Sequence, residues 1–155
     1  MPYLMRITDR DYREYRRNFS KIEYSFLKKG DVTPLPTKLI HDASMVGILS
    51  KYEFLKIVQD SRYAFYLYKN DNDEIIGVTS LLFKGRTCTI MEFCVFEHFQ
   101  GLGRKLYEQV AEVCRERRVY ELELWCPFDG AQEFWKKMEF YEKKETFFYK
   151  RISKH

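Results

Sequence analysis

Residues 87–105 read TCTIMEFCVFEHFQGLGRK and join an apolar run to a glycine-rich turn. Thr87–Val95 is apolar on both faces apart from Glu92, which is typical of a central strand. Apolar residues recur at helical spacing over Leu106–Cys114, so a helix is expected after the turn. Val119–Cys126 then alternates between apolar and polar side chains, as a strand does. This order predicts a βαβ unit with two parallel strands.

The turn has the composition of an anion-binding site. Backbone amides at a helix N-terminus lack partners within the helix and bind anions. Gly101 and Gly103 have no Cβ atoms to keep a pyrophosphate away from the backbone, and Arg104 and Lys105 add positive charge at the same place. A tight strand-to-helix turn also needs glycine for conformational reasons alone. The Gly-x-Gly pair therefore leaves a purely structural role open.

Helices and strands are also expected on both sides of this unit. The expected segments are a strand from Tyr3 to Ile7, an amphipathic helix from Tyr12 to Lys28, a loop from Asp31 to Asp42, a helix from about Ser44 to Gln59, strands at Tyr63–Lys69 and Glu74–Phe83, a helix at Asp129–Met138, and strands near Phe140–Lys144 and Thr146–Ile152. The helix from about Ser44 is expected to bury Ile48, Leu49 and Tyr52 on one face.

The composition indicates one domain, spanning residues 1–155. The chain has 155 residues, of which 45% are hydrophobic, with 27 basic and 23 acidic residues and a net charge of +4. That surplus is too small to indicate nucleic-acid binding by itself. Arg13, Arg16, Arg17 and Lys21 share one side of the first helix, which is either a solvated face or a contact for RNA.

The cysteines are spaced unlike metal ligands or a disulfide framework. Cys88, Cys94, Cys114 and Cys126 include no Cys-x-x-Cys pair and have no histidine at ligand spacing. We expect no metal site and reduced thiols. The N-terminus lacks a basic segment followed by a long apolar one, and no stretch approaches the roughly 20 apolar residues that span a bilayer. We therefore expect a cytoplasmic protein with no membrane segment.

Several motifs resemble those of the GNAT superfamily of N-acetyltransferases. His98-Phe99-Gln100-Gly101-Leu102-Gly103 is similar to the family's Gln/Arg-x-x-Gly-x-Gly/Ala signature, and residues 131–140, AQEFWKKMEF, resemble its Ala-x-x-Phe-Tyr-Glu-Lys-Leu-Gly-Phe helix. The resemblance extends from about Tyr3 to Ile152. It implies an α/β (α+β) fold, with a mixed, mostly antiparallel seven-stranded sheet that is splayed between the fourth and fifth strands and flanked by four helices.

The same resemblance implies a site for acetyl-CoA in the splay. Phe93, Cys94 and Val95 would border the pantetheine through their backbone. A backbone N–H of the fourth strand would polarise the thioester carbonyl while a primary amine attacks it. The pyrophosphate would be held by Gln100, Gly101, Leu102, Gly103, Arg104 and Lys105. The signature can be counted so that Gln100, Gly103 and Lys105 take its fixed positions, or so that His98, Gly101 and Gly103 do.

Glu92 is the expected catalytic base. Partial burial in an apolar strand would raise its pKa and suit it to accept a proton from an ammonium substrate, directly or through water. The family's frequent use of a glutamate on the fourth strand supports this role. The other interpretation is an inward carboxylate that is paired with a lysine or arginine, or one that lies at the wet splay of the sheet. Glu121 and Glu123, on one face of a later strand, are either solvated or attract a cationic acceptor.

The resemblance fails at the expected general acid. Trp135 stands where the family usually has the tyrosine that protonates the departing thiolate, and an indole N–H is not a useful acid. Tyr107, Tyr141 or water could replace it.

Three functions follow from these observations. The first is an acetyl-CoA-dependent N-acetyltransferase that acts by direct attack in a ternary complex, with the acceptor near residues 31–42 and the second helix. The second is an acyl-CoA-binding or interaction module that has lost the transfer chemistry. The third is transfer to charged RNA through the basic helix. The amine is not identified, and a homodimer remains open.

Overall fold

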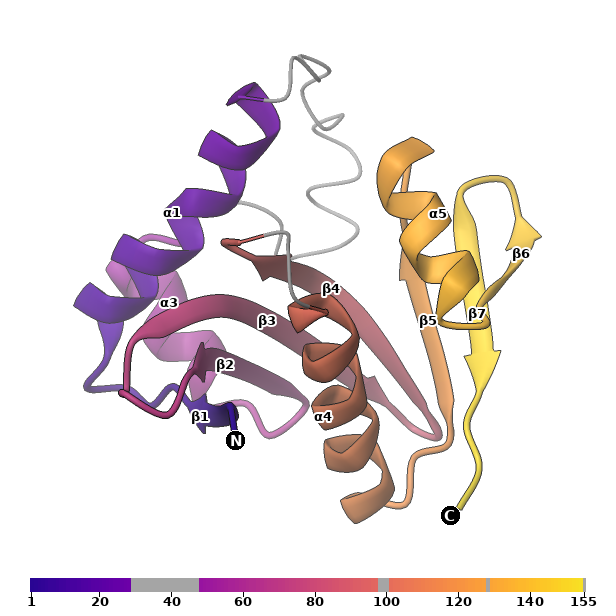
Figure 1. The fold of residues 1–155 in the computed structure, drawn as a ribbon. Helices are drawn as coiled ribbons and strands as arrows, with labels where there is room; N and C mark the ends of the chain where they lie inside the picture. The colour runs from indigo at the N-terminus through magenta and orange to yellow at the C-terminus, as the bar shows by residue number, and fades with distance from the viewer. Residues whose placement is uncertain (29–47, 98–100, 128, 155) are drawn as a thin grey trace.

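The computed structural model describes residues 1–28, 48–97, 101–127 and 129–154, with the side chains of residues 23–28 outside the description. These residues form four helices and seven strands (Figure 1). In chain order the elements are β1 Tyr3–Arg6, α1 Tyr12–Lys28, α3 Lys51–Val58, β2 Tyr63–Lys69, β3 Ile75–Lys84, β4 Thr87–Val95, α4 Leu102–Glu116, β5 Glu121–Trp125, α5 Asp129–Lys137, β6 Tyr141–Lys144 and β7 Phe147–Arg151. The predicted loop at 31–42 lies outside the described residues.

The strands form one mixed sheet in the order β1-β2-β3-β4-β5-β7-β6. Neighbouring strands are antiparallel except β4 and β5, which are parallel and are connected through α4. A parallel pair needs such a crossover, because the chain must return to the same end of the sheet before it starts the second strand. The predicted βαβ unit and the mostly antiparallel sheet are confirmed.

The sheet opens between β4 and β5. The parallel register contains only Thr87↔Glu121, Cys88↔Leu122 and Thr89↔Glu123, although β4 continues to Val95. The two strands therefore diverge after Thr89, and their separation is visible in Figure 1. The splay expected between the fourth and fifth strands is confirmed.

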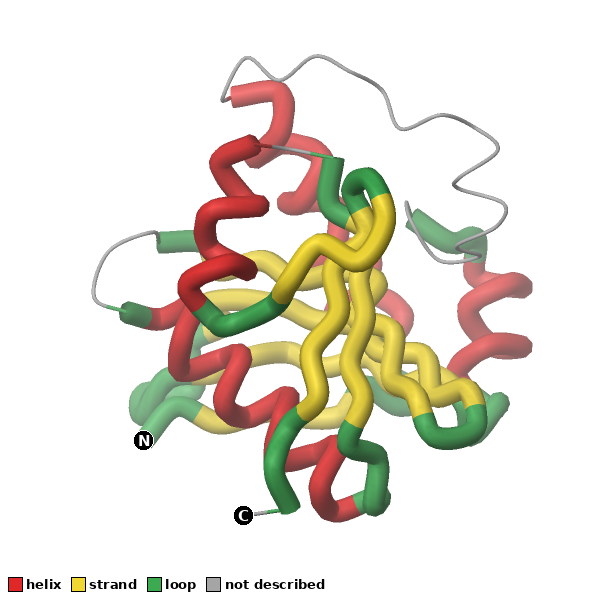
Figure 2. Tube along the Cα trace, turned by 90° about the vertical axis from the view of Figure 1, so that its right-hand side faces the viewer, coloured by secondary structure: helices red, strands yellow, loops and turns green. Residues whose placement is uncertain are grey.

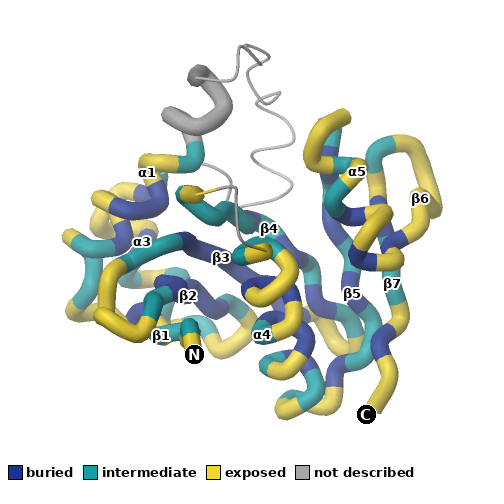
Figure 3. Tube along the Cα trace, viewed as in Figure 1, coloured by how far each residue is buried: buried dark blue, intermediate teal, exposed yellow. Residues whose placement is uncertain are grey.

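Helices pack on both sides of the sheet (Figure 2), which gives the molecule two hydrophobic cores. The core under α4 and α5 includes Leu106, Val110, Leu122 and Phe148. The core under α1 and α3 is aromatic, and its members include Tyr15, Phe19, Phe54 and Phe65. Buried residues accordingly follow the strands and the inner sides of the helices (Figure 3).

A β-bulge interrupts the pairing of β3 with β4. Ser80 pairs with Glu92 and Leu81 pairs with Ile90, so Met91 has no residue opposite it. One extra residue in a strand disrupts the ladder locally, bends the strand and increases its twist. The bulge lies close to the point where β4 leaves β5.

The bulge reverses which residues of β4 face each core. Before it, Ile90 belongs to the core under α4, whereas after it Phe93 and Val95 pack against that core. Cys94 packs against the core under α1. Glu92, two residues before Cys94, shares its face, because side chains alternate along a regular strand. The bulge therefore turns Glu92 toward α1 and α3.

The predicted start of the second helix is wrong. Ile48 and Leu49 are not helical, and α3 begins at Lys51 after a capping box in which Ser50 and Glu53 satisfy each other's backbone amides. Tyr52 is 77% exposed, whereas Phe54 is buried. The cap sets the helix start, and with it the face that points inward.

Gly77 on β3 allows close approach to β4, and this predicts a stability difference. A Cβ atom at Gly77 would lie 2.6 Å from the Cys94 carbonyl oxygen, whereas one at Gly130 in α5 would meet nothing within 4 Å. We expect Gly77→Ala to lower the free energy of unfolding by about 1–3 kcal/mol. The control, Gly130→Ala, should leave it unchanged or raise it by up to about 1 kcal/mol. Urea unfolding measures both, and equal stabilities would contradict the close approach.

Candidate active site

The turn before α4 uses its two glycines in different ways. Gly101 is the N-cap residue, with φ +69° and ψ 21°, a left-handed conformation that favours glycine. Gly103 lies in the first turn of α4, where a Cβ atom would come 2.9 Å from Cε1 of Phe134 on α5. One glycine thus permits the backbone turn and the other permits the approach of α5. This geometry favours the count of the signature that matches both glycines; His98 and Gln100 lie outside the described residues.

The N-terminus of α4 is positively charged. Its first-turn amides have no carbonyl partners within the helix. The first turn contains no acidic residue, and both Arg104 and Lys105 are exposed beside it. The peptide dipoles and these two cations therefore act in the same direction and favour an anion.

The last part of β4 directs backbone amides into the splay. Phe96 donates its N–H to the carbonyl of Ile76 on β3 at 2.9 Å. Successive residues of a strand direct their amides to opposite sides. The amides of Phe93 and Val95 therefore point away from β3, into the opening between β4 and β5, whereas the amide of Cys94 points toward β3.

Aromatic side chains border the opening on the α5 side. The ring centroid of Phe93 lies 4.8 Å from that of Trp135 and 5.6 Å from that of Phe134. Trp135 is buried and also packs edge-on against Phe140, at 5.1 Å. At the position where the family usually has a tyrosine, this chain therefore places a buried indole.

Glu92 is held in the interior by a hydroxyl group. Its side chain is only 7% exposed, and the Ser80 hydroxyl donates to Oε1 at 2.9 Å. Burial raises the pKa of Glu92 to about 8, although the hydrogen bond from Ser80 lowers it. None of the five ion pairs among the described residues includes Glu92. Among the described residues, the Glu92 carboxylate is therefore hydrogen-bonded to Ser80, and the expected alternative of a lysine or arginine partner is not observed.

Two tyrosines of α1 fix the chain beside Glu92. The Tyr15 hydroxyl accepts from the amide of Leu49 at 3.0 Å, and the Tyr12 hydroxyl donates to the Leu49 carbonyl at 3.0 Å. Burial raises the pKa of Tyr15, and the nearby charge of Glu92 raises it further. The segment entering α3 is thus held against α1 on the face of the sheet that carries Glu92.

The two tyrosines considered as substitute acids differ in position. Tyr107 is buried, its ring centroid lies 6.3 Å from that of Trp135, and burial raises its pKa to about 12. Tyr141 is 53% exposed on β6, where it packs against Tyr149. Of the two, Tyr107 is the one in contact with the aromatic border of the splay.

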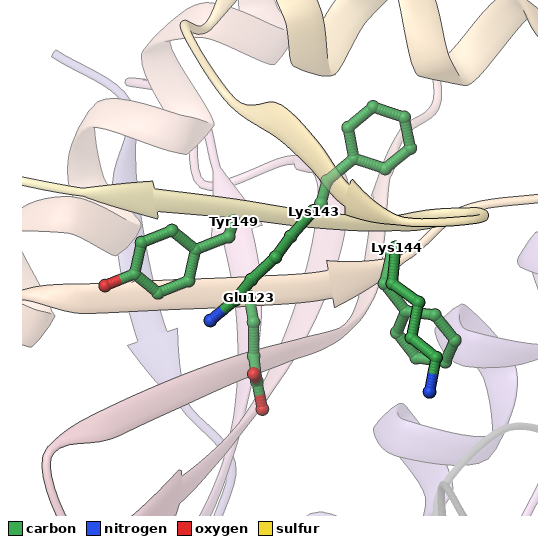
Figure 4. Close-up of a pocket in the computed structure, with 6 residues that line it drawn as sticks. Glu123, Lys143, Lys144 and Tyr149 are labelled. Carbon is green, nitrogen blue, oxygen red and sulfur yellow. The ribbon is translucent and has the colours of Figure 1, made fainter.

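A hollow of about 390 Å³ lies beside β5, β6 and β7 (Figure 4). Its lining residues are Glu123, Lys143, Lys144, Phe147, Phe148 and Tyr149. The two carboxylates of β5 are hydrogen-bonded. Thr89 donates to Glu123 at 3.0 Å, and Tyr149 donates to Glu121 at 2.8 Å. Glu121 and Glu123 are therefore half-buried acceptors and not merely solvated.

Sequence reasoning missed Thr79 and Ser80. The Thr79 hydroxyl donates to the backbone carbonyl of Glu92 at 2.8 Å, and both hydroxyl residues are buried. The available signal was the adjacent Thr-Ser pair inside the otherwise apolar run of residues 75–83, IIGVTSLLF. Buried hydroxyl groups are costly unless they are hydrogen-bonded, so such a pair indicates a specific partner.

The described residues hold neither a metal-ligand cluster nor a membrane-spanning helix. No group of three or more His, Cys, Asp and Glu side chains within them could hold a metal ion. No helix in the same residues is long and apolar enough to cross a membrane.

The sequence and the fold agree on one family. A sequence model of the acetyltransferase (GNAT) family matches residues 36–140. This match covers more than half of the chain, so the protein belongs to the GNAT family of acetyltransferases.

Individual relatives are distant. The uncharacterized protein YxbD of Bacillus subtilis (strain 168) is 28% identical over 75 residues, which span 48% of this chain and 45% of that protein. The PaiA N-acetyltransferase of Thermoplasma acidophilum, solved in complex with coenzyme A, superposes with a TM-score of 0.72 at 12% identity and covers 98% of this chain and 99% of its own. A GNAT-family acetyltransferase of Staphylococcus aureus Mu50 superposes with a TM-score of 0.67 at 16% sequence identity. This superposition covers 99% of this chain and 100% of that one. At these identities the solved structures show the fold.

The burial of Glu92 predicts a pH dependence of stability. Its pKa rises from 4.5 to about 8 on folding, so the folded state holds the proton more tightly. The resulting stabilisation is complete below the unfolded pKa and is lost as pH rises to the folded pKa. We expect the free energy of unfolding to fall across this window by an amount on the order of a few kcal/mol.

The variant Glu92→Gln cannot ionise and isolates this effect. It should show a smaller fall in urea unfolding measured at a series of pH values. Parallel curves for the two proteins would contradict a raised pKa at Glu92.

Proposed function

We propose that the protein is a cytoplasmic, single-domain acetyl-CoA-dependent N-acetyltransferase that transfers an acetyl group directly to a primary amine. The observation that carries the proposal is the placement of Glu92. It is a buried carboxylate of raised pKa, next to the residue where β4 begins to direct amides into the splay. A proton acceptor and carbonyl-polarising donors are therefore adjacent on one strand.

The α4 N-terminus is suited to the phosphates of acetyl-CoA. Its unpaired amides, the glycine turn and the exposed Arg104 and Lys105 favour a pyrophosphate, and the first turn carries no opposing acid. The coenzyme A complex of the structurally similar PaiA N-acetyltransferase supports this assignment. Gln100 and Leu102 complete the proposed phosphate site, and Phe93 and Val95 border the pantetheine through their backbone. Cys94, also expected there, directs its backbone toward β3 instead, because backbone groups alternate along the strand.

The chain supplies three functions to the transfer. Acetyl-CoA contributes an activated thioester carbonyl that an amine can attack. An inward amide of β4, from Phe93 or Val95, hydrogen-bonds the carbonyl oxygen as negative charge develops on it. Glu92 accepts the proton of the amine, through a water because the side chain is buried. Tyr107, whose ring centroid lies 6.3 Å from that of Trp135, donates a proton to the departing thiolate.

A second function is favoured by one specific observation. Trp135 is packed into the aromatic border of the splay in place of an acidic hydroxyl group. An acyl-CoA-binding module without transfer would need no such acid. Transfer to RNA has less support, because the exposed Arg13, Arg16 and Arg17 lie on the outer side of α1 and the net charge is only +4.

Loss of the carboxylate at Glu92 should separate turnover from binding. We expect Glu92→Gln to bind acetyl-CoA with unchanged affinity in calorimetry. Release of the CoA thiol with a panel of polyamines, amino acids and lysine peptides should fall by roughly 10²-fold or more. The matched control, Glu116→Gln at the exposed end of α4, should retain activity. Absence of acetyl-CoA binding to the unmodified protein at millimolar concentration would overturn the proposed function.

Replacement of Trp135 tests the proton donor. We expect Trp135→Tyr to raise kcat while acetyl-CoA binding is unchanged, because a phenol is a stronger proton donor than an indole. Trp135→Phe has no such group and serves as the control. If all three proteins bind acetyl-CoA and none releases thiol with any amine, the binding module replaces the transferase as the conclusion.

A further inference from the structure

Buried polar side chains gather at the bulge of β4. Among the described residues, the buried polar or charged ones are Asn18, Thr79, Ser80 and Glu92. Asn18 lies on α1 and donates to the carbonyl of Glu14 at 2.8 Å within that helix. The other three contact one another where β3 faces β4. Burying three polar side chains together costs free energy that only mutual hydrogen bonds offset.

Ser80 contacts the reactive end of Glu92. The two residues are directly opposite in the β3–β4 register, so their side chains share a face of the sheet. Ser80 is 0% exposed, and its hydroxyl donates to Oε1 at 2.9 Å. This bond orients the carboxylate. It also stabilises the charged form, which partly offsets the rise in pKa that burial causes. In the proposed function, the other oxygen, Oε2, accepts the proton.

Thr79 holds the backbone of the same residue. Its hydroxyl donates to the Glu92 carbonyl at 2.8 Å, next to the bulge where the ladder between the strands shifts by one residue. Neighbouring strand residues point to opposite faces, so Thr79 and Ser80 reach Glu92 from the two sides of the sheet. One hydroxyl therefore fixes the backbone and the other fixes the side chain.

We propose that Thr79 and Ser80 are positioning residues for the catalytic base, with Ser80 orienting the Glu92 carboxylate and Thr79 holding the bulge that presents it. The inference rests on the proposed function, because it gives Glu92 the role of base. Neither hydroxyl group touches the reacting atoms. Both act through Glu92.

Titration of the Glu92 carboxylate tests the role of Ser80 and needs no acceptor amine. We expect Ser80→Ala to raise the pKa of Glu92 by about one unit, because a hydrogen bond to the charged form is lost. NMR of protein labelled at its carboxyl groups measures this pKa. Ser80→Thr keeps a hydroxyl and should keep the pKa of the unmodified protein. An unchanged pKa in Ser80→Ala would overturn the role of Ser80.

Kinetics then separate positioning from structural support. With the most reactive amine of the panel, Ser80→Ala should lower kcat/KM at neutral pH by about tenfold and move the acidic limb of the pH profile upward. In a Glu92→Gln background, Ser80→Ala should have no further effect. An equal loss in both backgrounds would overturn the inference. If Glu92→Gln keeps full turnover, the base assignment of the proposed function fails instead.

Thr79 has a nearly isosteric test. Thr79→Val removes the hydroxyl but keeps the shape, whereas Thr79→Ser keeps the hydroxyl. We expect Thr79→Val to lower kcat severalfold with little change in KM for acetyl-CoA, and Thr79→Ser to retain kcat. Equal kcat values for the two variants would overturn the role of Thr79.

Discussion

Met91 has no partner on β3, and the geometry of the site depends on this unpaired residue. A bulge bends its strand and increases the twist, and this one follows closely on Thr89, the last residue of β4 that pairs with β5. The same extra residue turns Glu92 toward α1 and places Phe93 and Val95 against the core under α4. The opening of the sheet and the orientation of the carboxylate thus lie within one short segment.

The residues proposed to bind the phosphates of acetyl-CoA and the side chain of the proposed base lie on different sides of the sheet. The glycine turn leads into α4, which packs on the face that Phe93 and Val95 share, whereas Glu92 faces the aromatic core under α1. Only at the splay can a group pass between these faces, because elsewhere the strands are hydrogen-bonded to each other. The low polarity around Glu92 keeps its pKa high, and the cations of α4 are placed in the opposite layer.

Local patterns predicted the elements and the parallel β4–β5 pair, whereas side-chain contacts between distant residues were not predictable. Thr87–Val95 formed as expected, because an apolar run between two glycine turns has few alternatives. The family resemblance supplied the splay. The start of α3 was missed because the apolar periodicity continues on the N-terminal side of Ser50, the residue that caps the helix. The bulge has no residue signature in β4, so the face of Glu92 and its bond to Ser80, twelve residues away, could not be predicted from the sequence.

The α4 helix begins at the glycine turn and continues into the core that spans both halves of the sheet, through Leu106, Val110 and Cys114. Three register pairs of β4 and β5, the hydrogen bond from Thr89 to Glu123 and this shared core join the two halves. The helix is therefore a structural link between the half-sheets as well as the proposed phosphate-binding element. An anion bound at its first turn would be held by an element that is packed into the core of both half-sheets.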